Sequence, residues 1–478
     1  MLMLPEIIVV CSAALVLLAD MLCAERKRVI ITPIAAAGLA SAMLALMIFV
    51  PQTGSMFGGR FVLDSVAWWF KIFFTFSGLI TVLLSLDLLD GRTAVRATGI
   101  GFRGEYYSVL LATISGMMFL ISARDIITLY VSLELATIPL FILAAWRRDD
   151  VRSGEAGLKY VIIGAMASAF VLYGLGLFYG ITGSTTIANV SSQLKNTPAL
   201  WLMAAMLTAG IGFKLTIVPF HFWAADVYQG APAPVTAYLS VASKGAGLAF
   251  MFQLFYGIGR EFIADASLFI AVFAAITMTL GNTVAIVQSN IKRFMAFSAI
   301  SQAGYLIMGF LSSDSGGAAA MIFYMLVYAV TNLTVFACII WYSNQTGKET
   351  IEDYRGLSRT NPAIALAMML GLFGLSGIPP LSGFVGKFFL FSVASKAGYH
   401  WLVAVAAVNS TISLYYYLRI VRQMYIEPVD ENAIKLPITP TLAITLTALT
   451  VAAVIMGIVP MLYETIAKEV VQAVILGK

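Results

Sequence analysis

The chain has 478 residues, of which 60% are hydrophobic and only 11% are charged, with a mean hydropathy of +0.92. Soluble domains typically contain about 25% charged residues, so this composition excludes an ordinary soluble protein. Apolar runs of about twenty residues, each long enough to cross a bilayer, recur along the whole chain. These runs are continuous and do not alternate with polar residues, which excludes a transmembrane β-barrel. The sequence therefore predicts an all-α polytopic membrane protein.

The net charge of +5 does not indicate a nucleic-acid partner, because the basic residues lie mostly in short loops between apolar runs. The cysteines Cys11, Cys23 and Cys338 have no metal-binding or redox spacing. The two histidines, His221 and His400, do not supply a haem site or an iron–sulfur ligand set. The sequence therefore predicts no metal and no redox cofactor on this chain, and a lipid bilayer as its surroundings.

Apolar segments of about twenty residues, taken in chain order, predict about fourteen transmembrane helices. The predicted spans cover residues 6–23, 29–50, 66–86, 106–121, 126–145, 157–180, 200–220, 232–256, 266–287, 294–311, 318–341, 361–395, 400–421 and 439–460. The segment 361–395 is too long for one straight span and contains Gly377-Ile-Pro-Pro380, so we expect a broken helix there. The tail 461–478 is expected to form a short helix at the membrane interface.

Basic residues are concentrated in alternate loops, for example Arg26–Arg28 and Lys292–Arg293. Cytoplasmic loops are enriched in Lys and Arg, and the predicted number of spans is even, so both termini are predicted on the outer side. No small-residue cleavage site precedes the first basic cluster, so the first apolar run is expected to remain as a helix. All linkers are short, and we expect residues 1–478 to form one membrane domain.

The stretch Gly210–Gly247 places charged residues and prolines inside an apolar sequence. Within a helix, Pro219 removes a backbone hydrogen bond, and its ring clashes with the Leu215 carbonyl four residues earlier. In a bilayer, broken backbone persists only where protein buries it or where it lines a wet cavity. Lys214 lies beside this break, which makes it a functional-site hypothesis. A second break at Pro379 suggests the repeat architecture of many transporters.

Lys244 lies ten residues after Pro234, about 15 Å along a helix, which is about half-way across the hydrocarbon layer. Burial disfavours the charged form of a lysine and a nearby carboxylate favours it, so such a group can load and release a proton when its partner moves. Arginine could not do this, because it stays protonated. The alternative, stronger for Lys214 than for Lys244, is a structural lysine that pairs with carbonyls freed by the break.

Glu134 lies near the middle of the span 126–145, in SLELATIPL. A lone charge at this depth costs about 2.5–3.5 kcal/mol on insertion scales, so the carboxylate must be neutral, wet or paired with a cation. The functional interpretation is a proton-relay carboxylate that modulates a lysine. The alternative is a structural ion pair between helices.

Other ionisable residues are interpreted in two ways. His221 follows the first break and either relays protons between the lysines, caps the broken helix end or meets water at the surface. Asp226 is expected only to pair with His221. Lys387, seven residues after Pro380, is a candidate terminal relay towards the outer side, whereas Lys159 lies where its side chain can extend to the inner membrane surface.

Three further features are interpreted as structural. Lys71, seven residues after Asp64, is expected to extend towards the outer face. Lys292 and Arg293 are taken to mark an inner loop. Tyr415–Tyr417 is expected to lie at the membrane interface, where aromatic residues are enriched.

Four segments carry a resemblance to a known family. GFKLTIVPFHFWAADVYQGAPAPV at 212–235 resembles the antiporter-like membrane subunits of respiratory complex I. SLELATIPL around Glu134, NIKRFMAFSAISQAGY at 290–305 and SGIPPLSGFVGKFF at 376–389 are also similar to that family. The wording VYQGAPAPV, followed by Lys244, is most similar to the N-type subunits of bacterial NADH–quinone oxidoreductase, and the resemblance extends over nearly the whole chain.

The resemblance implies two inverted five-helix repeats, with the seventh and twelfth helices broken. The expected divisions are N-terminal helices 1–105, a first repeat 106–256, a second repeat 266–425, and a C-terminal helix and tail 436–478. The family's proton-transfer positions fall on Glu134, Lys159, Lys214, Lys244 and Lys387, and His221 matches a histidine of the family's break motif.

This chain departs from the family's pattern at one position that bears on proton transfer. Gln302 stands between Ser301 and Ala303, where many relatives have a histidine. Glutamine does not titrate, so a relay through this position must use water or the amide dipole. Lys71 receives no support from the resemblance.

Three functions are considered for this chain. The first is a proton-translocating subunit of NADH–quinone oxidoreductase in the bacterial inner membrane, assembled with other antiporter-like and quinone-site subunits. NADH, FMN, iron–sulfur clusters and quinone would then be bound elsewhere in the complex. The second is an Mrp-type cation/proton antiporter subunit, and the third is a structural spacer. The sequence motif Gln-Gly-Ala-Pro-Ala-Pro favours the NADH–quinone oxidoreductase subunit. The lysines within predicted spans argue against a structural spacer.

Overall fold

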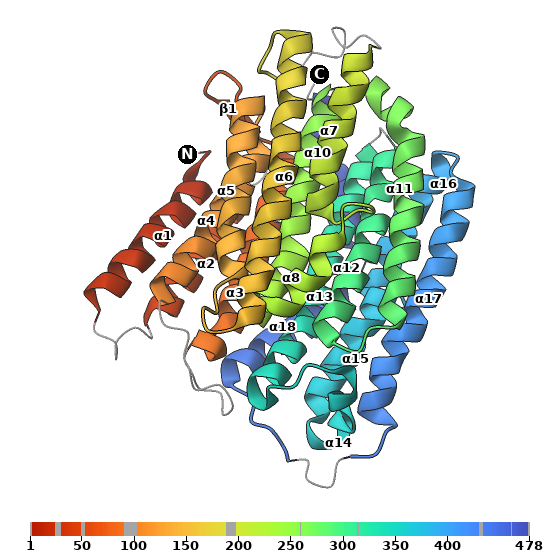
Figure 1. Cartoon of the computed structure of the whole chain (residues 1–478). Helices are drawn as coiled ribbons and strands as arrows, with labels where there is room; N and C mark the ends of the chain where they lie inside the picture. Colours follow the sequence, from red (N-terminus) through yellow and green to blue (C-terminus); the bar gives the residue numbers. More distant parts are fainter. Residues whose placement is uncertain are drawn as a thin grey trace.

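A computed structural model describes residues 2–23, 30–48, 53–89, 103–187, 197–258, 260–312, 315–429, 434–459 and 461–476. Within these ranges the chain is a bundle of long helices, with α1 and α2 on one flank and α16 and α17 on the opposite flank (Figure 1). The basic cluster at 26–28, on which the orientation partly depends, lies outside the described residues.

The described residues consist almost entirely of helices. In chain order the elements are α1 Leu4–Leu22, α2 Ile31–Ile48, β1 Gly54–Met56, β2 Phe61–Leu63, α3 Ser65–Leu89, α4 Arg103–Ser122, α5 Ile126–Ala144, α6 Val151–Thr182, α7 Pro198–Leu215, α8 Phe222–Gly230, α9 Ala233–Tyr238, the π-helix η3 Leu239–Ser243, α10 Lys244–Ile258, α11 Arg260–Ile286, α12 Ile291–Ile307, the 3-10 helix η4 Met308–Leu311, α13 Ser315–Thr346, the 3-10 helix η5 Ile351–Tyr354, α14 Leu357–Thr360, α15 Pro362–Ser376, α16 Ser382–Lys396, α17 His400–Tyr425, α18 Pro440–Ile458 and α19 Met461–Leu476. The strands β1 and β2 form one antiparallel hairpin.

Among the described residues, 13 helices are long and apolar enough to cross a membrane. The limbs α15 and α16, on either side of the second break, together provide one further crossing. The prediction of about fourteen spans, two of them broken, is confirmed. Helix α6 begins earlier than predicted because Asp150 caps it, accepting a hydrogen bond from the Arg152 N–H at 3.0 Å.

The first break separates α7 from α8. Helix α7 ends at Leu215, and Thr216 adopts the left-handed backbone conformation with a φ of 59°. In a continuous helix the ring of Pro219 would clash with the Leu215 carbonyl. Here that carbonyl accepts a hydrogen bond from the Thr216 hydroxyl at 2.5 Å. The Trp223 indole donates to the Phe213 carbonyl at 3.0 Å. Carbonyls at the end of α7 are thus paired within the protein, as a break in a bilayer requires.

The second break separates α15 from α16. Helix α15 ends at Ser376, and Gly377 takes the left-handed conformation with a φ of 88°, which glycine adopts without steric cost. Helix α16 begins at Ser382, and the backbones of the two limbs approach so closely that a Cβ on Gly383 would collide with the Gly374 carbonyl. The predicted break between Gly377 and Pro380 is confirmed.

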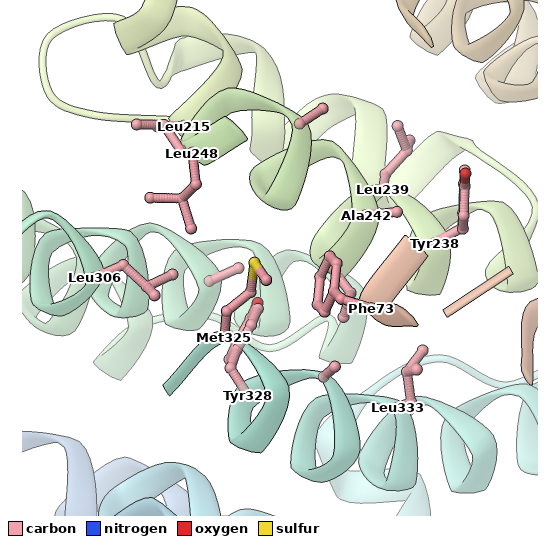
Figure 2. Close-up of a cluster of buried hydrophobic side chains, with 14 of the residues drawn as sticks. Phe73, Leu215, Tyr238, Leu239, Ala242, Leu248, Leu306, Met325, Tyr328 and Leu333 are labelled. Carbon is pink, nitrogen blue, oxygen red and sulfur yellow. The ribbon is translucent and has the colours of Figure 1, made fainter. Parts of the chain in front are cut away.

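The segment predicted as one helix over 232–256 is divided by a π-helical turn. Residues Leu239–Ser243 form η3, which ends immediately before Lys244. Such π-helical turns are frequent at functional sites, because they change the direction of the following side chains. Figure 2 shows part of the buried cluster around η3, in which Leu239 and Ala242 are drawn with Tyr328 of α13. The sequence carried no signal that distinguished this turn from an ordinary helix.

Helix α13 connects the two halves of the bundle. It is almost entirely buried, and it packs against α3 and α9 of the first half and against α15, α16, α18 and α19 of the second. A polar side chain on α13 therefore faces protein, whichever side of the helix it lies on.

The tail forms a short helix, as predicted, and its position at the membrane interface stays a prediction. Helix α19 packs against α13 and α3, and its residues Ile466 and Val470 are fully buried. Tyr463 stacks on Phe389, with ring centroids 3.4 Å apart, and Glu469 accepts a hydrogen bond from the Trp69 indole at 2.9 Å. One face of helix α19 therefore packs on the helix bundle.

The tyrosines Tyr415–Tyr417 do not form an interfacial cluster. Tyr415 is 64% exposed, whereas Tyr416 and Tyr417 are fully buried, because successive residues of a helix face different directions. Tyr416 donates to Asn282 at 2.8 Å.

Two lysines that were expected at the membrane surface are buried. Lys71 has no exposed side-chain surface and pairs with Glu6 at 2.6 Å. Lys292 is 3% exposed and pairs with Glu349 at 2.9 Å. The interpretations of Lys71 as extending to the outer face and of Lys292 as a simple loop signal are therefore wrong, since carboxylates distant in sequence cover both.

We predict that Gly383→Ala destabilises the protein, because the added methyl group would overlap the Gly374 carbonyl at the second break. Overpacking of a tight interior typically costs about 1–3 kcal/mol. Thermal unfolding of the detergent-purified protein measures the effect. Gly176→Ala is the matched control, since a Cβ at Gly176 would meet nothing within 4 Å; equal stability of both variants would contradict the prediction.

Candidate functional site

Lys214 lies in the last turn of α7, directly before the first break, and is 6% exposed. Its ammonium group donates a hydrogen bond to the Thr137 hydroxyl on α5. Thr137 lies one helical turn after Glu134 and on the same side of α5. The break therefore holds Lys214 against the part of α5 that carries the buried carboxylate.

Glu134 lies close to Lys214 but is not locked to it. The Glu134 charge acts on Lys214, yet no ion pair within 4.0 Å joins them among the described residues. The Glu134 Oε1 atom is buried and has no hydrogen-bond partner in the described part of the chain. The Glu134 side chain as a whole is partly exposed, so the carboxylate is not enclosed on every side.

Lys244 lies on the other side of the first break. It is 2% exposed, and its ammonium donates to the Thr216 hydroxyl at 2.6 Å. Thr216 is the residue whose left-handed conformation ends α7, two residues after Lys214. The Thr216 hydroxyl therefore binds Lys244, and Thr216 itself lies only two residues after Lys214 in the chain.

Between Lys244 and the second break, helix α13 contributes a stripe of polar residues at positions 324, 328 and 332, spaced one turn apart. Tyr328 donates to the Ser240 carbonyl at 3.0 Å, and Asn332 donates to the Ser240 hydroxyl at 2.5 Å. Ser240 belongs to η3, one turn before Lys244. Tyr324, at the other end of the stripe, donates to the amide oxygen of Gln302.

Gln302 connects this stripe to the second break. Its amide nitrogen donates to the Leu375 carbonyl at 2.9 Å and to the Tyr417 hydroxyl at 3.5 Å. Tyr417 and Ser298 share a hydrogen bond of 2.6 Å. Gln302 is fully buried, and both its amide nitrogen and its amide oxygen are hydrogen-bonded. The side chain therefore contributes a fixed dipole and no titratable group.

Lys387 lies on the far limb of the second break and is 3% exposed. It donates to the Ser376 carbonyl at 2.9 Å and to the Ser410 hydroxyl at 3.0 Å, and it lies 4.5 Å from the centre of the Tyr305 ring. Ser376 follows Leu375, the partner of Gln302. The second break therefore joins Lys387 to the same polar series.

The buried polar series contains four of the six candidate residues. It extends from Glu134 through Lys214 and Lys244 to Lys387, across the middle of the bundle. The connecting residues were not predicted, although the spacing of four between Tyr324, Tyr328 and Asn332 along one predicted helix was a readable signal. They are Tyr324, Tyr328, Asn332 and Tyr417, with Ser240 and Thr216.

Lys159 lies outside this series. Its side chain is 39% exposed and pairs with Asp226 at 2.6 Å and with Glu155 at 2.7 Å. Asp226 also pairs with Arg293 at 2.6 Å, so this carboxylate bridges α6 and α12. The expectation that Asp226 only pairs with His221 is wrong, because two cations from other helices occupy both of its oxygens.

His221 precedes α8 and makes no side-chain capping hydrogen bond. It is 7% exposed, lies against Phe222 and has no hydrogen bond to Lys214 or Lys244 among the described residues. The capping and surface interpretations are therefore wrong, and the relay role stays a prediction.

The described residues contain no group of three or more His, Cys, Asp or Glu side chains that could hold a metal ion. Cys11, Cys23 and Cys338 are free thiols. The chemistry of the site therefore consists of ammonium, carboxylate, hydroxyl and amide groups.

The arrangement of two broken helices, each beside a buried lysine, defines a class of membrane subunits. The family described as NADH:quinone oxidoreductase/Mrp antiporter, TM, matches residues 123–413. Respiratory complex I from Thermus thermophilus with bound aureothin contains a similar chain, with a TM-score of 0.81 and 30% identity, covering 96% of this chain and 98% of that one. A chain of the Mrp complex from Dietzia has a TM-score of 0.84 at 22% identity, covering 98% and 97%, and shares the fold.

Curated relatives specify the branch of this class. The chain is 37% identical over 477 residues to NADH-quinone oxidoreductase subunit N of Trichlorobacter lovleyi, covering 98% of this chain and 96% of the relative. It is 41% identical over 401 residues to subunit N of Heliobacterium modesticaldum, covering 84% and 83%. The chain therefore belongs to the NADH-quinone oxidoreductase subunit N family.

We predict that Thr216→Val lowers the free energy of unfolding, because it leaves the buried Lys244 ammonium without its hydroxyl partner. Hydrogen bonds to charged groups contribute about 1.5–3 kcal/mol. Thr216→Ser keeps the hydroxyl and should retain most of the stability in chemical denaturation. If Val and Ser at this position proved equally stable, the contact would have no energetic role.

Proposed function

We propose that this chain is a proton-translocating membrane subunit of a bacterial NADH–quinone oxidoreductase. Membership of the subunit N family supports the assignment to the complex. The observation that carries the proton role is the buried series itself: three lysines, at two helix breaks, bonded to hydroxyl and carbonyl groups instead of carboxylates. Ammonium groups without a fixed counter-ion are costly in a bilayer, and such residues typically mark ion pathways.

The proposed mechanism starts with a change in the distance between Glu134 and Lys214. When the carboxylate approaches, Lys214 holds its proton; when the carboxylate withdraws, the lysine releases it towards Thr216 and Lys244. The proton continues along the tyrosine stripe of α13 and past Gln302 to Lys387. A hydroxyl group can rotate and pass a proton to its neighbour, whereas the Gln302 amide is fixed and does not titrate. Proton transfer past Gln302 is therefore the slowest step of the series.

The driving force must come from outside this chain. Moving one charge against a membrane potential of 100 mV costs about 2.3 kcal/mol, and no group of the series supplies that energy. We propose that quinone reduction in a neighbouring subunit displaces Glu134. NADH, FMN, iron–sulfur clusters and quinone are assigned to those other subunits, and no redox centre to this one.

We further propose the inner membrane of a bacterium as the location, with both termini on the outer side. The 13 membrane-spanning helices among the described residues, with α15 and α16 taken together as a fourteenth crossing, make the proposed number even, and the loop charges of the sequence supply the direction. Within the single membrane domain, residues 106–256 and 266–425 are proposed as the two inverted repeats, because each range contains one broken helix.

An Mrp-type antiporter subunit is the alternative function, because a chain of an Mrp complex has the same fold. The lysines of the buried series bind hydroxyl and carbonyl groups, and no carboxylate among the described residues pairs with them to offer a site for a metal cation. Identification of the subunits that copurify with the chain distinguishes the two assemblies.

Lys244→Ala is expected to reduce proton pumping in the assembled complex by about 10²-fold or more, the typical contribution of a positioned proton-transfer group. Lys244→Arg should also fail, because arginine stays protonated. Pumping is measured with a pH-sensitive dye in proteoliposomes, relative to electron transfer. Normal assembly with unchanged pumping would refute the proposed role.

Lys159→Ala is expected to reduce pumping less than Lys244→Ala does. Lys159 is partly exposed and already shared between two carboxylates, so it lies outside the buried series. The same dye assay compares both variants at equal complex content. A loss as large as that of Lys244→Ala would place Lys159 on the main route instead.

A further inference from the structure

The structure contains a second carboxylate–lysine pair that the proposed mechanism does not use. Glu6, in the first turn of α1, and Lys71, on α3, lie 2.6 Å apart, and both side chains have no exposed surface. Taking two charges out of water is expensive, and a buried ion pair is often no more stable than an apolar pair of similar size. Stability alone therefore does not account for this pair.

Neither side chain is held by other polar groups in the described part of the chain. Both carboxylate oxygens of Glu6 and the Lys71 ammonium lack further hydrogen-bond partners. The nearest aromatic contact is the Phe61 ring, 4.8 Å from the Lys71 nitrogen. Protonation of Glu6 would break no further hydrogen bond among the described residues, and its cost is the loss of the counter-ion of Lys71.

On one side, the pair faces charges that reach solvent. Asp64 and Arg124, which come from the segments before α3 and α5, form an ion pair of 2.6 Å, and each is 22% exposed. They are the next charges that act on Lys71. Arg124 also donates to the Gln253 side chain on α10 at 2.5 Å. Asp64 is therefore the partly exposed carboxylate that we assign to proton exchange between the pair and the protein surface.

On the other side, the aromatic residues of α3 separate the pair from Lys244. Phe70 contacts Phe252 of α10, with ring centroids 6.0 Å apart. A Cβ on Gly245, the residue after Lys244, would collide with the Phe73 ring, which Figure 2 shows in the buried cluster beside η3. The pair thus lies between Lys244 and the end of the bundle at which α1 begins.

We propose that Glu6 and Lys71 form a further proton-binding site, on a branch that leads from Lys244 past Phe73 to Asp64. The proposal rests on the proposed function. In the step, the Glu6 carboxylate takes up one proton and becomes a neutral acid, while Lys71 keeps its charge. The acid then releases the proton through Asp64 to water, which restores the ion pair.

The test is the double variant Glu6→Gln with Lys71→Met in the complete complex. It removes both charges together while keeping the side-chain volumes, so an uncompensated buried charge does not arise. The expected result is normal assembly, with pumping relative to electron transfer reduced roughly tenfold or more. Unchanged pumping would overturn the proposal.

The matched control removes another buried ion pair, at the opposite end of the bundle: Lys292→Met with Glu349→Gln. This control should pump normally; an equal loss would mean that the first result reflects any missing ion pair, and would overturn the proposal. Lys244→Ala separates the two hypotheses. If Lys244→Ala abolishes pumping and the Glu6 variant does not, only the branch fails; if neither variant affects pumping, the proposed function itself fails.

If the double variant does not assemble, infrared difference spectra recorded on addition of NADH test whether Glu6 takes up a proton. Glu6→Asp keeps a carboxylate at this position. A carboxylic-acid band that appears during turnover of the unmodified complex and shifts in Glu6→Asp supports proton uptake by Glu6. Identical spectra for the two proteins would overturn the proposal.

Discussion

Two interrupted helices create the constraint on which the rest of the structure depends, because a bilayer cannot hydrogen-bond the backbone groups that an interruption leaves free. At the first break a threonine hydroxyl and a tryptophan indole bind carbonyls at the end of α7. At the second break the Lys387 ammonium and the Gln302 amide bind two adjacent carbonyls at the end of α15. The need to pair the backbone thus brings polar side chains to the centre of the membrane domain.

The same constraint explains why the lysines differ in their partners. Lys159 and Lys292 pair with carboxylates, which stabilise their charge. In the centre, Lys214, Lys244 and Lys387 bind neutral oxygen atoms. A neutral partner leaves the proton of an ammonium group transferable, whereas a carboxylate holds it. The proposal that the three central lysines transfer protons therefore rests on their neighbours and not on their position in the sequence.

Helix α13 unites the two breaks. Tyr328 and Asn332 bind η3 beside Lys244, and Tyr324 binds Gln302 beside the second break. Because α13 is buried on all sides, these contacts depend on the packing of several helices at once. Displacement of any one of them would change the spacing between the lysines.

The sequence by itself determined the class of the protein, the approximate helices and both break points. These properties are local: apolar runs set the spans, and a proline removes a hydrogen bond from its own helix. Local reasoning also placed Lys214, Lys244 and Lys387 in the membrane interior. The same reasoning identified Glu134 as a candidate carboxylate, whereas the proton-transfer role of Lys159 came from the resemblance to the antiporter-like family.

The tertiary structure decided which distant residues meet. Lys71 appeared to be a surface lysine until α1 placed Glu6 against it, and Tyr417 appeared interfacial until α12 placed Gln302 and Ser298 beside it. The same holds for Asp226, which binds cations from two other helices. A sequence records the polarity of each residue and its period along one helix. It does not record which helices lie side by side, and in a bilayer that arrangement decides whether a charge is paired, shared or free to transfer its proton.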